Sequence, residues 1–418
     1  MLFCALVRIF RPRPAALLVA VALSFLAGCG RPSAPALLET PAAAGASLPR
    51  LSTDPEGGAW LSWVEPTPTG HALRFAPFDA AGWGAVGTAA EGADWFMNWA
   101  DFPSVVHLGA GRMAAHWLQK VPGGVYAYHV QMAVSTDGGR QWSAPLAPHA
   151  DDSPTEHGFA SLFPAPGGVG AVWLDGRHTE AAPQGADEHE HDHHGHGAMT
   201  LRAGGLDWSG ARLPERELDD MTCDCCPTAA ATLPDGVVVL YRDRTVEEIR
   251  DIRATTLSSD GWSSPVLVAD DRWEMRACPV NGPAVAAVGD RVAAAWFTAA
   301  GGTPRIRVAF SPDGGRSWES SIEVADGPVL GRVAIVMPDE ESAIVSWLEH
   351  SRARAEIRFR RITALGGAGP AYKLATTVAA RSSGFPQMTL AGDQLLFAWT
   401  ETGEPSAIRT AIAPLPRR

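Results

Sequence analysis

A short apolar strand with an aromatic residue near its centre recurs along this chain and constrains the fold more than any other feature. The recurring aromatic residues are Trp63, Trp117, Trp173, Tyr241, Trp296, Trp347 and Trp399. Successive members are separated by 54, 56, 68, 55, 51 and 52 residues, and the long third gap contains the insertion EAAPQGADEHEHDHHGHGA. An aromatic residue in such a strand is expected to be core. A period of this length predicts repeated supersecondary units that stack on their neighbours.

Each unit contains further strands on either side of the aromatic one. Apolar segments such as FPSVVHL and GPAVAAV precede it, and YHVQMAVS, IRVAFS and IRFRRI follow it. About four strands per unit are typical of a propeller blade. We therefore predict an all-β fold, a β-propeller of four-stranded blades, with seven blades favoured and six as the alternative. The last unit ends at IRTAIAPLPRR without an outer strand, so a segment before Ser52 should supply that strand and close the ring.

The pattern SxDxGxxW marks the turn after the third strand of two units. Its two full copies consist of Ser135, Asp137, Gly139 and Trp142, and of Ser311, Asp313, Gly315 and Trp318. A shortened copy, SSDGW, begins at Ser258. This pattern resembles the Asp box, or BNR repeat, of the sialidase superfamily. The expected role is structural, because Ser and Asp bond turn amides and Gly permits positive φ. The resemblance also implies that these residues lie away from any active site.

The N-terminal segment predicts export. It has early arginines, an apolar run and a small-residue end, which is typical of a signal peptide over residues 1–28. The sequence Leu26-Ala27-Gly28-Cys29 resembles the lipobox of bacterial lipoproteins, which implies lipidation of Cys29. We expect an outer-membrane lipoprotein facing the periplasm or the surface, and anchored by its lipid alone. Residues 29–47, rich in Pro and Ala, are predicted to be a tether, and residues 48–418 a single propeller domain.

The loops on one face of the predicted propeller carry most of the unusual polar residues. In a propeller, the loops that enter each innermost strand and those that follow each second strand share a face. The predicted ligand-binding residues there are Arg177, Arg242, Arg244, Arg276, Asn281, Arg332 and Arg381. Arginine forks suit carboxylates and phosphates, so we expect an anionic small molecule or glycan as ligand. The formal net charge of −12 argues against a nucleic-acid partner, and a monomer is expected.

Catalysis is an alternative for the same face. The resemblance to sialidases implies an arginine triad, a tyrosine nucleophile paired with glutamate, and an acid/base aspartate. The chain departs from this pattern, since it lacks an Arg-Ile-Pro motif and none of its four tyrosines sits in a matching motif. An exo-sialidase, or another glycoside hydrolase, remains the alternative function. Its candidate catalytic carboxylates are Asp175, Asp243 and Glu349.

Cysteines and histidines gather on neighbouring loops of this face. Three cysteines, Cys223, Cys225 and Cys226, lie in MTCDCC, and Cys278 enters the next blade. The insertion over residues 180–198 adds His189, His191, His193, His194 and His196. Thiolate and imidazole ligands together favour copper(I) or zinc. Exported proteins also form disulfides, so a bridge from Cys278 to the cluster in an interaction scaffold stays open beside the metal.

Overall fold

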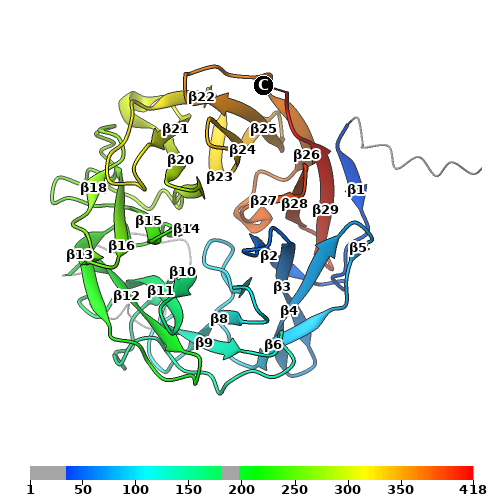
Figure 1. Cartoon of the computed structure of the whole chain (residues 1–418), viewed down its shortest axis with the longest axis vertical. Helices are drawn as coiled ribbons and strands as arrows, with labels where there is room; N and C mark the ends of the chain where they lie inside the picture. The colour runs from blue at the N-terminus through cyan, green and yellow to red at the C-terminus, as the bar shows by residue number, and fades with distance from the viewer. Residues whose placement is uncertain (1–33, 180–196, 418) are drawn as a thin grey trace, which may run out of the picture. The chain divides into compact units, whose positions relative to one another are not determined.

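Seven antiparallel sheets surround a central axis (Figure 1). The structure, a computed structural model, describes residues 34–179 and 197–417. The seven sheets confirm the prediction of an all-β, seven-bladed propeller and exclude the six-bladed alternative. In the described part of the chain, helix is limited to two short 3₁₀ turns, η1 (Ala300–Gly302) and η2 (Arg381–Ser383). No described helix is long and apolar enough to cross a membrane.

The first three blades follow one another in the chain, each running from an innermost to an outer strand. Blade 1 consists of β2 (Ser47–Thr53), β3 (Ala59–Thr67) and β4 (Gly70–Asp79), with β5 (Gly82–Trp83) and β6 (Gly87–Gly92) both paired to β4. Blade 2 consists of β7 (Ser104–His107), β8 (Met113–Lys120) and β9 (Tyr128–Ser135). Blade 3 consists of β10 (His157–Ala165), β11 (Gly168–Asp175), β12 (Met199–Asp207) and β13 (Arg216–Thr222).

The remaining four blades complete the ring. Blade 4 consists of β14 (Ala229–Leu233), β15 (Gly236–Arg242) and β16 (Ile252–Ser258), with β17 (Gly261–Trp262) and β18 (Val266–Leu267) on its outer edge. Blade 5 consists of β19 (Ala284–Val288), β20 (Arg291–Thr298), β21 (Arg305–Ser311) and β22 (Ile322–Asp326). Blade 6 consists of β23 (Val329–Asp339), β24 (Ser342–Ser351), β25 (Arg354–Thr363) and β26 (Tyr372–Thr377). Blade 7 consists of β27 (Gln387–Ala391), β28 (Gln394–Glu401), β29 (Ala407–Pro414) and β1 (Ala36–Leu38).

Strand β1 closes the ring from the other end of the chain. It pairs antiparallel with β29, with Ala36 opposite Ile412 and Leu38 opposite Thr410, and Figure 1 shows the two strands side by side. The prediction that a segment before Ser52 supplies the outer strand of the last blade is confirmed. The closing strand comes from within residues 29–47, the segment predicted to be a tether. This pairing covers the edge of β29 that would otherwise be open, and it joins residues from both ends of the chain in one sheet.

The second strand of each blade is the buried one, and its aromatic residue occupies an equivalent place throughout. In six blades the aromatic residue lies directly opposite an arginine of the third strand: Arg74, Arg202, Arg253, Arg307, Arg358 and Arg409. In blades 1, 5 and 6 one carboxylate, from Glu65, Asp271 or Glu349, accepts from both the aromatic residue and the arginine. In blade 6, for example, Trp347 Nε1 donates to Glu349 Oε2 at 3.1 Å, and Arg358 Nη1 donates to Glu349 Oε1 at 3.1 Å. This aromatic–carboxylate–arginine arrangement satisfies polar groups that the sheet covers.

The two SxDxGxxW segments form the same hydrogen-bonded turn. Ser135 Oγ accepts from Gly139 N at 3.0 Å, and Asp137 Oδ1 accepts from Arg140 N at 3.0 Å and Gln141 N at 2.9 Å. The second copy repeats the serine contact from Gly315 N at 2.8 Å. Its two central glycines have φ of 74° and 89°, where other residues are strained. These turns follow third strands, so they lie on the face opposite the predicted ligand loops.

Candidate functional site

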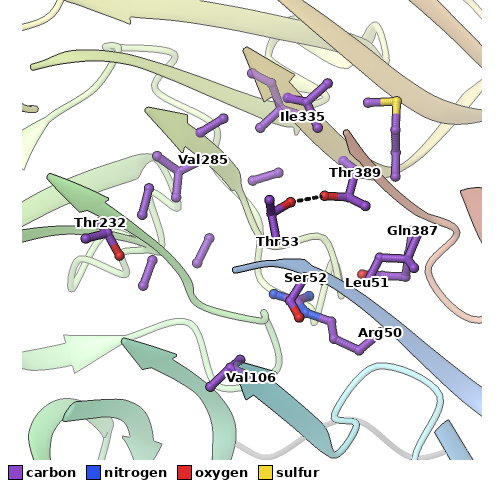
Figure 2. A pocket seen from close by; sticks show the side chains of 18 of the residues that line it. Arg50, Leu51, Ser52, Thr53, Val106, Thr232, Val285, Ile335, Gln387 and Thr389 are labelled. Atoms are coloured by element: carbon purple, nitrogen blue, oxygen red, sulfur yellow. Dashed lines mark hydrogen bonds between the residues drawn. The ribbon is translucent and has the colours of Figure 1, made fainter. Parts of the chain in front are cut away.

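The seven innermost strands surround a cavity of about 530 Å³ on the central axis (Figure 2). We call this cavity the channel, and the end at which the innermost strands begin is its mouth. Small aliphatic side chains make up most of the lining. Among the polar exceptions are Arg50 and the pair Thr53 and Thr389, whose hydroxyl oxygens are 2.5 Å apart. The channel is large enough for a small molecule, because its volume lies within the range of ordinary ligand pockets.

The backbone at the mouth is locally distorted. Innermost strands β10 and β23 carry register shifts at Gly158/Ser161 and Gly331/Ala334. Within these bulges Phe159 and Arg332 both have φ of 54°, a left-handed conformation that is uncommon for such residues. Bulges re-aim side chains and occur often beside active sites, where strained residues also collect. The mouth is therefore a place where the fold departs from regular blade geometry.

Arg50, from β2, is the charged residue whose guanidinium reaches the channel (Figure 2). Its guanidinium carbon lies 5.6 Å from the centre of the Phe102 ring. Across residues 34–179 and 197–417, Arg50 forms no hydrogen bond or ion pair, and burial alone lowers its pKa. A cation that is removed from water without a partner is unfavourable unless a ligand or solvent compensates for it.

Three half-buried aromatic rings connect Arg50 with a second arginine at the mouth. Phe102 lies 6.0 Å from Phe385, and Phe385 lies 5.9 Å from Trp99, between ring centres. The Arg332 guanidinium stands 4.7 Å from the Trp99 ring centre, within the range of a cation–π contact. The mouth therefore presents an aromatic surface with a cation at each end.

A tyrosine and two carboxyl groups form a buried network next to Arg50. The Tyr128 hydroxyl lies 2.7 Å from Asp101 Oδ2 and 2.6 Å from Glu156 Oε1. Burial raises the pKa of Asp101 to about 7 and that of Glu156 to about 8, against the effect of the tyrosine hydrogen bond. One hydroxyl proton cannot serve two carboxylates, so the network holds an additional proton at neutral pH. Asp101 also lines a side cavity of about 50 Å³ with Arg50 and His116, whose buried Nε2 has no partner among the described residues.

The four predicted cysteines do come together, and we call Cys223, Cys225, Cys226 and Cys278 the thiol cluster. The sulfur atoms of the first three all lie within 4.8 Å of one another, and those of Cys223 and Cys226 are 3.2 Å apart. Cys278 reaches the Cys225 thiol from the loop that enters blade 5. All four are free thiols in this structure. The predicted histidine ligands His189, His191, His193, His194 and His196 fall outside the described residues, as does Cys29.

Charged neighbours surround the thiol cluster. Arg250 Nη1 donates to Cys223 Sγ at 3.2 Å, and Arg244 Nη1 donates to Asp224 Oδ2 at 3.2 Å. Burial alone would raise the pKa of Cys223, but hydrogen bonds from the neighbouring thiols and the charges of Arg250 and Arg242 outweigh it and hold that pKa well below the usual range. Asp224 Oδ1 is buried and has no partner in the described part of the chain.

A second cluster, His129, His149 and His157, lies between blades 2 and 3, and we call it the histidine cluster. The ring centres are 4.3 to 5.0 Å apart, and the rings of His149 and His157 are stacked. The ring nitrogens face separate partners: His129 Nε2 lies 2.9 Å from Ser153 O, and His157 Nε2 lies 3.0 Å from Asp151 Oδ2. His149 Nδ1 lies 3.0 Å from Asp151 O, and its Nε2 is buried without a partner among the described residues. In the described part of the chain the donor atoms of the three histidines do not all come within 4.8 Å of one another, so this cluster is a packed hydrogen-bonding element.

Arg242 and Asn281, both predicted to bind ligand, instead join neighbouring blades. Arg242 is 1% exposed and donates to the carbonyl oxygens of Asn281, Arg250 and Phe297 at 2.6 to 3.0 Å. The Asn281 side-chain oxygen accepts from Arg332 N at 2.8 Å. Because the Arg242 guanidinium already donates to three carbonyls, it is placed as a structural cross-link between blades 4 and 5.

The other predicted arginines differ in their settings. Three of them pair with carboxylates. These are Arg177 with Asp175 and Glu215, Arg244 with Glu248 and Asp224, and Arg276 with Glu274. Arg276 is 78% exposed, so it offers no enclosed anion site by itself. Arg332 lies at the mouth, where its Nη1 donates to Ser383 Oγ at 2.8 Å. Burial and the charge of the nearby Arg381 lower the Arg332 pKa to about 10.

The three predicted catalytic carboxylates lie in three different blades and are not brought together. Asp175 is completely buried and accepts from Trp173 Nε1 at 2.8 Å, and Arg177 donates to both of its oxygens. Asp243 pairs with Arg253 at 2.6 Å. Glu349 is the bridging carboxylate of blade 6 described above. Glu349 completes the aromatic–carboxylate–arginine arrangement of its blade. Asp175 instead joins Trp173 to Arg177, and Asp243 pairs with Arg253.

Sequence reasoning missed Arg50, which lines the channel, and the Asp101–Tyr128–Glu156 network next to it. Arg50 lies in SLPRLST, the innermost strand of blade 1. The innermost strands of the other blades carry mostly small apolar residues, so an arginine there is a signal that the sequence does contain. Asp101 and Glu156 sit in loops that enter innermost strands, but nothing in the sequence joins them to Tyr128. Their meeting depends on the packing of blade 2 against blade 3.

Comparison with known proteins supports the architecture. No family model matches the chain, and no curated protein matches it. Among solved structures, a polysaccharide lyase, Uly1, is similar at 8% identity with a TM-score of 0.50, over 88% of this chain and 89% of that one. An α-L-arabinofuranosidase from Fusarium graminearum has 12% identity, a TM-score of 0.47, and coverage of 88% and 93%. The phage phi92 endosialidase has 8% identity, a TM-score of 0.47, and coverage of 90% and 68%. At these identities the likeness is one of fold.

Proposed function

We propose that this protein is an exported, sialidase-like propeller that binds an anionic carbohydrate or related small anion at the mouth of its channel. The observation that carries the proposal is Arg50, a half-buried guanidinium that faces the channel with no counter-ion among the described residues. A guanidinium donates two parallel hydrogen bonds to a carboxylate or phosphate. Its isolation from protein carboxylates leaves those donors available to a ligand.

The surroundings of Arg50 favour a ligand with both an anionic group and an apolar face. Trp99, Phe102 and Phe385 form the aromatic surface beside the channel. Ligand pockets typically combine such apolar walls with a few polar groups that fix orientation. A sugar ring carrying a carboxylate fits this description, because its faces are apolar and its acid group can pair with Arg50.

Calorimetric titration of the mature chain tests this proposal. The probes are glucuronate, N-acetylneuraminate and inorganic phosphate. We expect at least one probe to bind, and Arg50→Gln to weaken that binding tenfold or more, about 1.4 kcal/mol or above. Arg140→Gln is the matched control, because Arg140 is an exposed arginine in the turn on the opposite face. Equal affinity of the Arg50→Gln variant and the native chain would refute the assignment.

A second candidate function, glycoside hydrolysis, is favoured by the Asp101–Tyr128–Glu156 network. Carboxyl groups that retain a proton near neutral pH can act as general acids. Glu156 is the partly exposed member, so it is the group that can reach a substrate at the mouth. The test is release of a fluorophore from sialyl, glucuronyl and arabinofuranosyl reporters, with loss of release in Glu156→Gln. Absence of turnover with binding intact would leave a binding protein.

We also propose that the protein is held on the outer membrane by a lipid on Cys29. The support is the lipobox-like sequence Leu26-Ala27-Gly28-Cys29. A single acyl-modified cysteine anchors a chain without a spanning helix. Metabolic labelling with a fatty-acid analogue should mark the native chain and not Cys29→Ser, and the variant should appear in the soluble exported fraction. Labelling that persists in the variant would contradict the anchor.

A further inference from the structure

The thiol cluster has the geometry of a metal site, and it is separate from the anion site proposed above. Three sulfur atoms from one four-residue segment all lie within 4.8 Å of one another. Metal–thiolate bonds are about 2.3 Å long, so two sulfurs on one ion lie at most about 4.6 Å apart. We propose that Cys223, Cys225 and Cys226 bind a thiophilic d¹⁰ metal ion, with Cu(I) the better fit and Zn(II) the four-coordinate competitor.

The loop that carries the thiols is fixed by the blade behind it. Cys223 N donates to Arg242 O at 3.0 Å, and Thr222 forms an isolated bridge with Asp243. Arg242 is itself held by three carbonyl oxygens, as described above. Two residues after Cys226 the chain reaches Thr228, which donates to Phe159 O at 2.7 Å. The sulfurs are therefore held together by structure on both sides of the segment, as a preorganised site requires.

The charge around the cluster suits bound thiolates. Three thiolates and one Cu(I) ion carry a net charge of about −2, which is unfavourable in a buried place without cations. Arg250 donates directly to Cys223 Sγ, and Arg242 lies behind the same segment. Arg250 is also paired with Glu248, which is shared with Arg244. This arrangement orients the arginines toward the loop and offsets part of the negative charge.

The number of cysteines distinguishes the two ions. Cys223, Cys225 and Cys226 alone provide three sulfurs, which suits trigonal Cu(I). Zn(II) sites of structural type are almost always tetrahedral and need four ligands. Cys278, whose thiol contacts that of Cys225, is the available fourth sulfur. Removal of Cys278 should therefore affect Zn(II) binding and spare Cu(I).

The test uses residues 29–418 carrying Cys29→Ser, reduced and kept free of oxygen. Cu(I) is titrated in competition with a coloured Cu(I) chelator, and Zn(II) with a coloured Zn(II) chelator. We expect one Cu(I) per chain with a near-ultraviolet band from thiolate-to-copper charge transfer. The Cys225→Ser variant should lose that band and bind Cu(I) at least a hundredfold more weakly. Cys278→Ser should keep the band.

Each remaining outcome decides between the alternatives. Binding that lacks the thiolate band and survives Cys225→Ser belongs to histidines elsewhere in the chain and overturns the proposal. If the chain binds Zn(II) tightly, loses it in Cys278→Ser and does not bind Cu(I) tightly, the thiol cluster is a metal site but the metal is zinc. A Cys223–Cys226 or Cys225–Cys278 disulfide in the isolated protein, with no metal bound after reduction, overturns it. His149→Gln is the matched control, and its stoichiometry should equal that of the native chain. None of these readouts depends on anion binding, so the two proposals fail separately.

Discussion

The thiol cluster and the histidine cluster differ in how their donor atoms point. Each brings together a loop that enters an innermost strand and a residue of the adjacent blade. In the histidine cluster the rings stack, and ring nitrogens bond carbonyls and carboxylates of their own loops. In the thiol cluster the sulfurs face one another, and within the described part of the chain Arg250 is the one outside residue that donates to them. Convergence of donor atoms, and not residue type, therefore makes the thiol cluster the candidate for metal binding.

The largest expected effect separates the two clusters by metal-linked stability. A ligand at a concentration 1,000 times its Kd raises the free energy of unfolding by about 4 kcal/mol. Cu(I) loading should therefore shift the urea midpoint of the reduced native chain upward, and the shift should vanish in Cys225→Ser. The same shift should persist in His149→Gln. A loss of the shift in the histidine variant would erase the distinction between the clusters.

Removal of a histidine should cost stability without affecting metal. His157 is fully buried, contacts both other rings and lies 3.0 Å from Asp151. His157→Ala creates a cavity and removes one of the hydrogen-bond partners of Asp151, which keeps Ser153, so we expect a loss of about 2–4 kcal/mol in urea unfolding. Cu(I) stoichiometry, measured by chelator competition, should stay at the native value. If His157→Ala has the same free energy of unfolding as the native chain, the histidine cluster contributes little to packing.

Two sets of buried titrating residues, the histidine cluster and the pair Asp101 and Glu156, should change the stability of the chain with pH in opposite directions. Burial lowers the pKa of His149 to about 3, and that of His157 also falls. Their stabilising contribution is therefore present above the unfolded value of about 6.5 and is lost as pH falls, at up to about 1.4 kcal/mol per pH unit for each histidine. Asp101 and Glu156, with raised pKa values, contribute stability below about pH 4 that is lost as pH rises toward 8.

These opposing slopes overlap between about pH 4 and 6.5, so the native chain alone does not separate them. The histidine contribution is the difference between native and His149→Gln chains in urea unfolding at pH 7 and pH 5. We expect the variant to lose less stability on acidification. Asp101→Asn should have the complementary effect and flatten the decline between pH 6 and 8. Parallel pH profiles for all three proteins would contradict the burial-based assignment.

The smallest expected effect concerns a carboxylate that sequence alone made a catalytic candidate. Glu349 bridges Trp347 and Arg358 at a half-exposed position. Partly exposed ion pairs contribute about 0–1 kcal/mol, so Glu349→Gln should destabilise the chain by less than about 1 kcal/mol. Anion binding by calorimetry should be unchanged. A large loss of binding or turnover in this variant would return Glu349 to the site.

The success and failure of the sequence predictions have a common origin in the repeat. The seven aromatic strands indicated the blades, because each blade buries one such strand and the pattern of buried residues therefore recurs along the sequence. The same repetition placed Asp175, Asp243 and Glu349 after equivalent aromatic strands, where carboxylates occur for a structural reason. A single sequence shows charged loop residues but not which arginine each of these carboxylates pairs with in the folded blade. The catalytic interpretation of these carboxylates therefore lacked the partner that explains them.

What the sequence determined by itself was periodic or local. The repeat fixed the number of blades, and the spacing of Cys223, Cys225 and Cys226 within four residues fixed their proximity. The tertiary structure decided which polar groups remain unpaired. Among the described residues Arg50 is left without a counter-ion, while Arg242 donates to three carbonyl oxygens. The reason is physical, because pairing depends on contacts between blades that are about fifty residues apart in the repeat, and such contacts leave no local signal in the chain.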